Sequence, residues 1–250
     1  MKLGRCGAAI LAGALLCIGV PAAIPASAVV GGQAAEAASY PWLAAIGTPL
    51  FLTRPSGQFC AGVLIAPDQV VTAAHCVELA RIAPAALSVT FGRSDLRSTD
   101  GTSVRVKNIR VHPDFRESTF EGEPVYHNDL AVLTLDRAQS GPVLEIGPPQ
   151  GDSATILGWG ATGTDDSGNT RLNAATVPLA SNETCATAYG PSFDPNTMLC
   201  AGSTVADTAE YDSGGPLLVN GRVVALTSWG KGAAQPGYPG VYTRLTILNF

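Results

Sequence analysis

The chain has 250 residues and a formal net charge of −5 at pH 7, from 15 Lys and Arg against 20 Asp and Glu. This deficit of basic residues argues against a general role at nucleic acids or anionic membranes, since both need a positive protein surface. Charged residues make up only 14% of the chain, while 28 Gly and 18 Pro are abundant. Such a composition is typical of many short strands joined by turns.

The first 28 residues have the pattern of a signal peptide. Lys2 and Arg5 precede an uncharged apolar run at 6–20, and Ala26-Ser27-Ala28 supplies the small residues that signal peptidase accepts. The run is shorter than the ~20 residues that a membrane-spanning helix requires. We therefore expect a cleaved signal peptide at 1–28 and a secreted, extracellular domain at 29–250.

Short apolar runs recur along the rest of the chain and predict β-strands. They lie at 42–46, 62–65, 87–91, 104–106, 130–135, 154–157, 216–219 and 223–226. Asn220-Gly221, between the last two runs, predicts a hairpin because both residues tolerate positive φ. The segment 164–169 has the composition of an exposed loop, and only 181–188 looks helical, with Ser181 as its cap. Two antiparallel β-barrels fit this pattern, one at about 29–140 and one at about 141–250, with a boundary near 138–150.

Four cysteines follow the predicted signal peptide, namely Cys60, Cys76, Cys185 and Cys200. An even number in an exported protein predicts two disulfides, and three pairings remain open from the count alone. The sequence has no CxxC pair, and its histidines do not cluster with these cysteines. We therefore expect neither a metal nor another cofactor.

Three short motifs carry residues typical of nucleophilic catalysis. They are Thr72-Ala73-Ala74-His75-Cys76, Asn128-Asp129-Leu130-Ala131-Val132-Leu133 and Asp212-Ser213-Gly214-Gly215-Pro216. Each has an ordinary structural interpretation when taken alone, as an exposed His, a turn Asp or a Gly-Ser loop. Their occurrence together, in this order and in an exported β-rich chain, favours a catalytic interpretation.

These motifs resemble those of the chymotrypsin/trypsin family of serine proteases. The similarity extends from Val29 almost to the end of the chain and includes Val29-Val30-Gly31-Gly32, Leu157-Gly158-Trp159-Gly160, Ser228-Trp229-Gly230 and Pro239-Gly240-Val241-Tyr242-Thr243. The α/β-hydrolases use the same three residue types in another chain order and on a G-x-S-x-G elbow, so they do not match. The resemblance implies an all-β fold of two packed six-stranded antiparallel barrels, with the active site in the cleft between them.

The resemblance also implies roles for the motif residues. Ser213 is expected to be the nucleophile, His75 its general base and later the general acid, and Asp129 the group that orients His75. The N–H groups of Tyr211 and Ser213 are expected to stabilise the oxyanion. The disulfide pairing implied is Cys60–Cys76 and Cys185–Cys200.

Specificity and activation follow from the same resemblance. Asp207 lies six residues before Ser213, the position of the acid that binds a substrate Arg or Lys in trypsin-like members. The other substrate-binding residues expected are Thr208, Ser228, Trp229, Gly230 and Gly240. The new amine of Val29, exposed by signal peptidase itself, is expected to pair with Asp212. The expected partners are protein or peptide substrates with Arg or Lys before the scissile bond, and protein inhibitors, for a monomeric enzyme.

The sequence departs from the family in three places. Tyr211 replaces a glycine at an oxyanion donor, and Ala209 and Ala233 replace a disulfide that braces the specificity pocket in many relatives. The chain stops at Phe250, where relatives continue into a helix, so we expect this C-terminal helix to be truncated or absent. The alternative function is that of a catalytically weak or silent homologue that acts as a binding protein.

Overall fold

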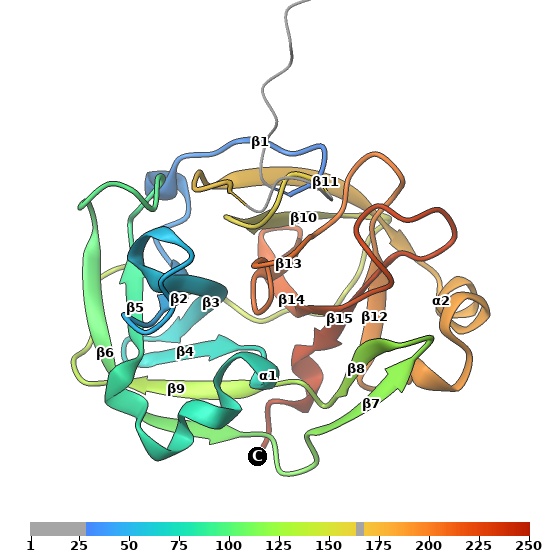
Figure 1. Ribbon diagram of the computed structural model, residues 1–250. Coiled ribbons are helices and arrows are strands. Elements are labelled where there is room, and N and C mark those ends of the chain that lie inside the picture. The colour runs from blue at the N-terminus through green and yellow to red at the C-terminus, as the bar shows by residue number, and fades with distance from the viewer. Residues whose placement is uncertain (1–28, 164–167) are drawn as a thin grey trace, which may run out of the picture.

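A computed structural model describes residues 29–163 and 168–250 (Figure 1). The predicted signal peptide and most of the loop predicted at 164–169 lie outside the described residues. No helix in the described ranges is long and apolar enough to cross a membrane.

The first half of the chain forms a closed antiparallel barrel in the strand order β2-β3-β4-β9-β6-β5. Its strands are β2 (Leu43–Gly47), β3 (Gln58–Ala66), β4 (Gln69–Thr72), β5 (Ser88–Phe91), β6 (Thr102–Val111) and β9 (Ala131–Leu135). Successive side chains of a strand point to opposite faces, so apolar and polar residues alternate along β6. Val104 and Val106 pack into the core, whereas Arg105 and Lys107 are exposed on the other face.

The second half forms another closed six-stranded barrel, in the order β11-β10-β13-β14-β15-β12, which the pairing of β11 with β12 closes. Its strands are β10 (Ser153–Gly158), β11 (Asn173–Ala180), β12 (Met198–Ala201), β13 (Pro216–Val219), β14 (Arg222–Trp229) and β15 (Gly240–Arg244). The short β1 (Gln33–Ala34) pairs with the first two residues of β11, while β12 pairs with the last two. Asn220 and Gly221 have φ of 51° and 75° and form the predicted turn between β13 and β14. The predicted two-barrel fold is confirmed.

A separate hairpin, which the apolar pattern did not predict, joins β7 (Arg116–Phe120) to β8 (Glu123–His127). Its turn residues Glu121 and Gly122 have positive φ, as a tight hairpin requires. The hairpin extends from the first barrel toward β12 and α2 of the second (Figure 1). Phe120 packs against Tyr189 there, with ring centroids 5.5 Å apart.

Helical structure is short. The α-helices are α1 (Ala74–Val77) and α2 (Asn182–Tyr189), and the 3-10 turns are η1 (Ala37–Ser39), η2 (Pro55–Gly57), η3 (Glu78–Ile82), η4 (Pro84–Ala86), η5 (Gly190–Ser192) and η6 (Leu245–Ile247). Helix α2 confirms the helix predicted at 181–188, and Ser181 caps it by accepting the N–H of Thr184.

Two disulfides form, Cys60–Cys76 between β3 and α1 and Cys185–Cys200 between α2 and β12. They have the pairing that the family resemblance implied. Each closes a loop of 16 or 15 residues. On the chain-entropy model a loop of this size stabilises the fold by ~3 kcal/mol.

Candidate active site

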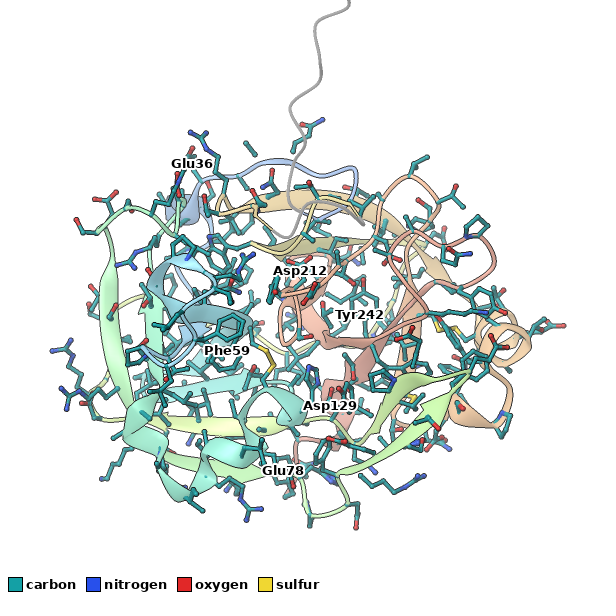
Figure 2. All side chains as sticks on the ribbon, viewed as in Figure 1. Glu36, Phe59, Glu78, Asp129, Asp212 and Tyr242 are labelled. Carbon is teal, nitrogen blue, oxygen red and sulfur yellow. A yellow bond between two sulfur atoms is a disulfide. The ribbon has the colours of Figure 1, made fainter. Side chains whose placement is uncertain are left out.

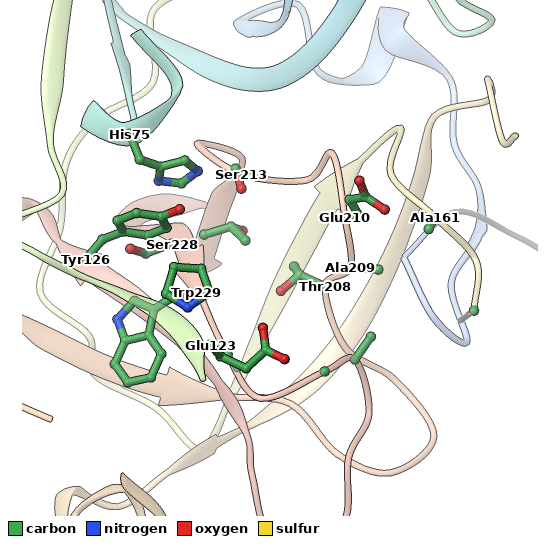
Figure 3. Close-up of a pocket in the computed structure, with 17 residues that line it drawn as sticks. His75, Glu123, Tyr126, Ala161, Thr208, Ala209, Glu210, Ser213, Ser228 and Trp229 are labelled. Carbon is green, nitrogen blue, oxygen red and sulfur yellow. The ribbon is translucent and has the colours of Figure 1, made fainter. Parts of the chain in front are cut away.

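A cavity of about 400 Å³ opens between the two barrels (Figure 3). His75 and Tyr126 line it from the first barrel and its hairpin, and Ser213, Trp229 and Gly230 line it from the second. Three buried polar residues, Asp129, Asp212 and Tyr242, lie near the middle of the molecule in Figure 2. The cleft predicted between the barrels is therefore present, and His75 and Ser213, from two of the three motifs, line it, while Asp129 of the third motif is fully buried.

Strand pairing brings His75 and Asp129 together. Thr72 at the end of β4 pairs with Ala131 at the start of β9, so the segments just beyond these two ends are neighbours. Asp129 Oδ2 lies 2.8 Å from His75 Nδ1, and its Oδ1 accepts the backbone N–H of His75 at 2.9 Å. Ser228 Oγ donates to Oδ2 at 2.5 Å. These contacts hold the carboxylate and the imidazole in one orientation.

Asp129 is fully buried, which by itself raises the pKa of its carboxyl. The charge of His75 and the hydrogen bonds from His75 and Ser228 act in the opposite direction and hold the pKa below its usual value. Asp129 is therefore an ionised acceptor at neutral pH.

The ring of His75 is also fixed by Tyr126, which stacks on it at 4.2 Å between centroids with 12° between the planes. Tyr126 was not predicted as a site residue, because its only signal in the sequence is an aromatic residue three positions before Asp129. Ser213 lies beside His75 at the same end of the cavity (Figure 3). No described hydrogen bond joins Ser213 Oγ to His75 Nε2, and such contacts often tighten only when substrate binds.

The turn that contains Ser213 is hydrogen-bonded to both barrels. The carbonyl of Ser213 accepts a hydrogen bond from the N–H of Ala61 in the first barrel, at 2.8 Å. The N–H of Gly214 donates to the carbonyl of Thr227 in the second barrel, also at 2.8 Å. Gly214 has φ of 77°, and a Cβ there would lie 2.3 Å from Thr72 Oγ1. Only glycine fits this position, which explains the Gly that follows Ser213 in the motif.

In the turn at 211–215, two N–H groups have no acceptor among the residues that the structure describes, those of Tyr211 and Ser213. The carbonyl of Glu210 accepts the N–H of Ala161 at 2.9 Å. Because a trans peptide directs its C=O and N–H to opposite sides, the N–H of Tyr211 is directed away from Ala161. These are the two donors that the sequence analysis expected for an oxyanion.

Tyr211 has φ of 75°, in the left-handed region that glycine adopts freely. A left-handed conformation costs a residue with a Cβ about 1–2 kcal/mol. Its carbonyl accepts from Gln58 Nε2 at 3.1 Å, and the guanidinium of Arg54 lies 4.2 Å from the centre of its ring. Arg54 is itself buried and donates to Gln58 Oε1 at 3.0 Å. The cation–π contact with Arg54 and the hydrogen bond from Gln58 stabilise this conformation of Tyr211 and so offset part of its free-energy cost.

Asp207 is buried behind Thr208 and Gly240, two residues that line the cavity. Its Oδ1 accepts the N–H of Thr208 at 2.8 Å and its Oδ2 that of Ala234 at 3.1 Å. A Cβ on Gly240 would lie 2.7 Å from Oδ1, so glycine lets this wall approach the carboxylate. Burial raises the pKa of Asp207 to about 7, although the two N–H donors act to lower it.

The other predicted pocket residues, Ser228, Trp229 and Gly230, also line the cavity. Ser228 has a second contact that was not foreseen, its hydrogen bond to Asp129.

Val29 and Asp212 are both fully buried in or against the second barrel. Asp212 Oδ1 accepts the N–H of Gly160 at 2.8 Å and Oδ2 that of Ala209 at 3.0 Å. A Cβ on Gly158 would lie 1.9 Å from Oδ1, which accounts for a glycine in the Leu157-Gly158-Trp159-Gly160 segment. Burial raises the pKa of Asp212 to about 7.

The expectation that no histidine clusters with the cysteines is wrong for His75, which precedes Cys76 in the chain. The ligand atoms of Cys60, His75 and Cys76 lie within 4.8 Å of one another, the one group in the described ranges close enough to hold a metal ion. Its two sulfur atoms are joined in the disulfide and offer no thiolate. These residues do not fit a metal site.

Comparison with known proteins agrees with this geometry. The model of the family described as Trypsin matches residues 29–250. A trypsin of Saccharopolyspora erythraea is 40% identical over 225 residues, 87% of this chain and 93% of the relative. Trypsin delta of Drosophila erecta is 32% identical over 88% of this chain and 85% of its own length. Serine protease 56 of Mus musculus is 36% identical, and its match covers 88% of this chain but 37% of the mouse protein. The chain therefore belongs to the trypsin family of serine proteases.

Proposed function

We propose that this protein is a secreted serine endopeptidase that hydrolyses peptide bonds after Arg or Lys through an acyl-enzyme. The observation that carries the proposal is the buried Asp129, bound to both the ring and the N–H of His75, beside a cavity that Ser213 also lines. A serine hydroxyl is a weak nucleophile at neutral pH and needs a neighbouring base that is held in the correct tautomer. Asp129 supplies that orientation, because its Oδ2 accepts a hydrogen bond from Nδ1–H, which keeps the proton on Nδ1 and leaves Nε2 free to act as a base.

The reaction then proceeds in two transfers. Ser213 Oγ attacks the carbonyl carbon while its proton passes to Nε2 of His75. The N–H groups of Tyr211 and Ser213 stabilise the oxyanion that forms, and His75 returns the proton to the leaving amine. Water attacks the resulting ester by the same path, and Ser213 is regenerated.

Asp207 selects the residue before the scissile bond. The cation of a substrate Arg or Lys would lie against the floor formed by Thr208 and Gly240. There it would favour the ionised form of the buried Asp207 carboxyl and pair with it. The buried carboxylate of Asp212 requires a cationic partner from elsewhere in the chain. Among the described Lys, Arg and His side chains none forms an ion pair with it, and the amine released at Val29 would provide one. Signal peptidase cleavage after Ala28 would then both release the exported protein and activate it.

A fluorophosphonate probe tests the proposed function. We expect covalent labelling of the secreted wild-type protein at Ser213 and none of Ser213→Ala, since the probe reacts only with an activated serine. The labelled band should begin at Val29 on N-terminal sequencing. A folded wild-type protein that is not labelled would instead favour a silent homologue that binds a partner, and labelling of a form that begins earlier would contradict the activation by Val29.

Replacement of Tyr211 separates the backbone conformation from the ring. Tyr211→Gly removes the left-handed strain, whereas Tyr211→Ala keeps the strain and removes the ring that Arg54 holds. We expect kcat to rise above wild type in the Gly variant and to be roughly 5- to 30-fold lower in Ala than in Gly, corresponding to about 1–2 kcal/mol of strain. The check is steady-state kinetics on one Arg ester. Equal kcat values for the Ala and Gly variants would show that φ at this position does not limit catalysis.

A further inference from the structure

The β7–β8 hairpin is held rigidly at the rim of the cavity. Its five cross-strand pairs run from Arg116–His127 to Phe120–Glu123, and Val125 is fully buried. Ser118 Oγ and His127 Nε2 lie 2.8 Å apart across the two strands. Together with the packing of Phe120 on Tyr189, these contacts fix the hairpin against the second barrel. A side chain on its cavity edge is therefore a positioned group rather than part of a loose loop.

Glu123 is such a side chain. It is the first residue of β8, it lines the cavity together with Trp229 and Gly230, and its carboxylate extends into the open space in Figure 3. No described hydrogen bond or ion pair involves this carboxylate, and the side chain is exposed. Glu121, two residues earlier on the same hairpin, is different, because Lys231 binds its carboxylate.

Charge around the cavity is distributed unevenly. Glu123 and Glu210 line it, and Lys and Arg are absent from its described lining. Two cations beside the lining have partners: Lys231 binds Glu121, and Arg54 lies over the ring of Tyr211. An exposed carboxylate without a counter-ion attracts a cation on the ligand, and the low dielectric of a cleft strengthens that attraction.

The backbone beside Glu123 can hold a peptide in an extended conformation. Within β14, residues 222–226 pair with β13, but Trp229 pairs only with Val241 of β15. The other edge of Ser228–Gly230 borders the cavity. An extended peptide can add to such an edge as a further strand, which would lead it from Ser213 past Gly230 and Glu123.

We propose that Glu123 is a specificity residue that binds a second Lys or Arg of the substrate, on the amino-terminal side of the residue that precedes the scissile bond. This proposal rests on the proposed function and names its substrate class: extended peptides with at least two basic residues, one for Asp207 and one for Glu123.

Matched peptides test this proposal. Every peptide carries Arg before the scissile bond, and the two peptides of a pair differ at one position, where one has Lys and the other norleucine. This position is one of the three that precede that Arg (upstream) or one of the two that follow the scissile bond (downstream). We expect wild type to prefer Lys over norleucine by about two- to fivefold in kcat/KM at one or more upstream positions, the range of an exposed ion pair. The preference should decline as salt is raised from low ionic strength. In Glu123→Gln the ratio should fall to one, and in Glu123→Lys it should fall below one.

Glu121→Gln is the matched control, because it removes a carboxylate from the same hairpin that Lys231 already neutralises. It should keep the wild-type ratio. A wild-type ratio of one at all upstream positions, a preference that persists in Glu123→Gln, or a preference confined to the downstream positions would overturn the proposal. These outcomes leave cleavage after Arg intact, whereas failure of the wild type to cleave any Arg peptide would contradict the proposed function itself.

Discussion

Asp129→Asn is expected to lower kcat by about 10⁴-fold, the loss typical of the equivalent substitution in this family, while the fold is retained. Asp129 Oδ2 accepts from both His75 Nδ1 and Ser228 Oγ, and Oδ1 accepts the N–H of His75. An Asn amide replaces one of these acceptors with a donor. Its NH₂ group would drive His75 into the tautomer that carries its proton on Nε2, and a protonated Nε2 cannot accept from Ser213.

The measurement is kcat on an Arg ester, with far-UV circular dichroism to check that the variant folds. Asp136→Asn is a suitable control, since it removes an exposed carboxylate just beyond the opposite end of the same strand, β9, and should leave kcat unchanged. A loss of less than about 100-fold in Asp129→Asn would mean that the orientation of His75 depends mainly on its stacking with Tyr126.

The two barrels were predictable because their strands carry the alternation and the turns that specify them. Val104 and Val106 alternate with exposed basic residues, and Asn220-Gly221 adopts the positive φ angles of a tight hairpin. The proximity of His75 and Asp129 could be expected only from the resemblance. The β4–β9 register that brings them together joins residues far apart in sequence, and no local pattern encodes it.

The β7–β8 hairpin could not be predicted for a related reason. Its strands, Arg116–Phe120 and Glu123–His127, are largely polar, and Pro124 interrupts the second, which argues against a strand. The hairpin is stable because Phe120 and Val125 pack on residues of the second barrel. The same holds for Arg54, whose contacts with Gln58, Trp159 and Tyr211 depend on tertiary structure. The features peculiar to this chain are thus set by long-range contacts.

Asp207→Ser is expected to lower kcat/KM for Arg and Lys esters by roughly 10²- to 10³-fold, because the buried substrate cation would lose its counter-charge at a cost of about 2–5 kcal/mol. Esters of Leu and Phe need no such charge, so their kcat/KM should not fall. The comparison of the four esters within one variant controls for any general loss of activity. Unchanged hydrolysis of the Arg ester would remove Asp207 from the specificity pocket.

The protonation of Asp207 gives a second test of the same assignment. Burial raises its pKa to about 7, with a contribution from nearby Asp212, so the empty pocket holds a neutral carboxyl below that pH. If Asp207 binds the basic ligand as proposed, benzamidine, a cation at these pH values, should bind the ionised form and displace the proton. Its affinity should therefore increase about tenfold per pH unit as the pH rises from 5 toward 7 and level off above it. Calorimetry in two buffers of different ionisation enthalpy should detect one proton released near pH 6. An affinity independent of pH in this range, or an equal pH dependence in Asp207→Ser, would show that benzamidine does not pair with Asp207.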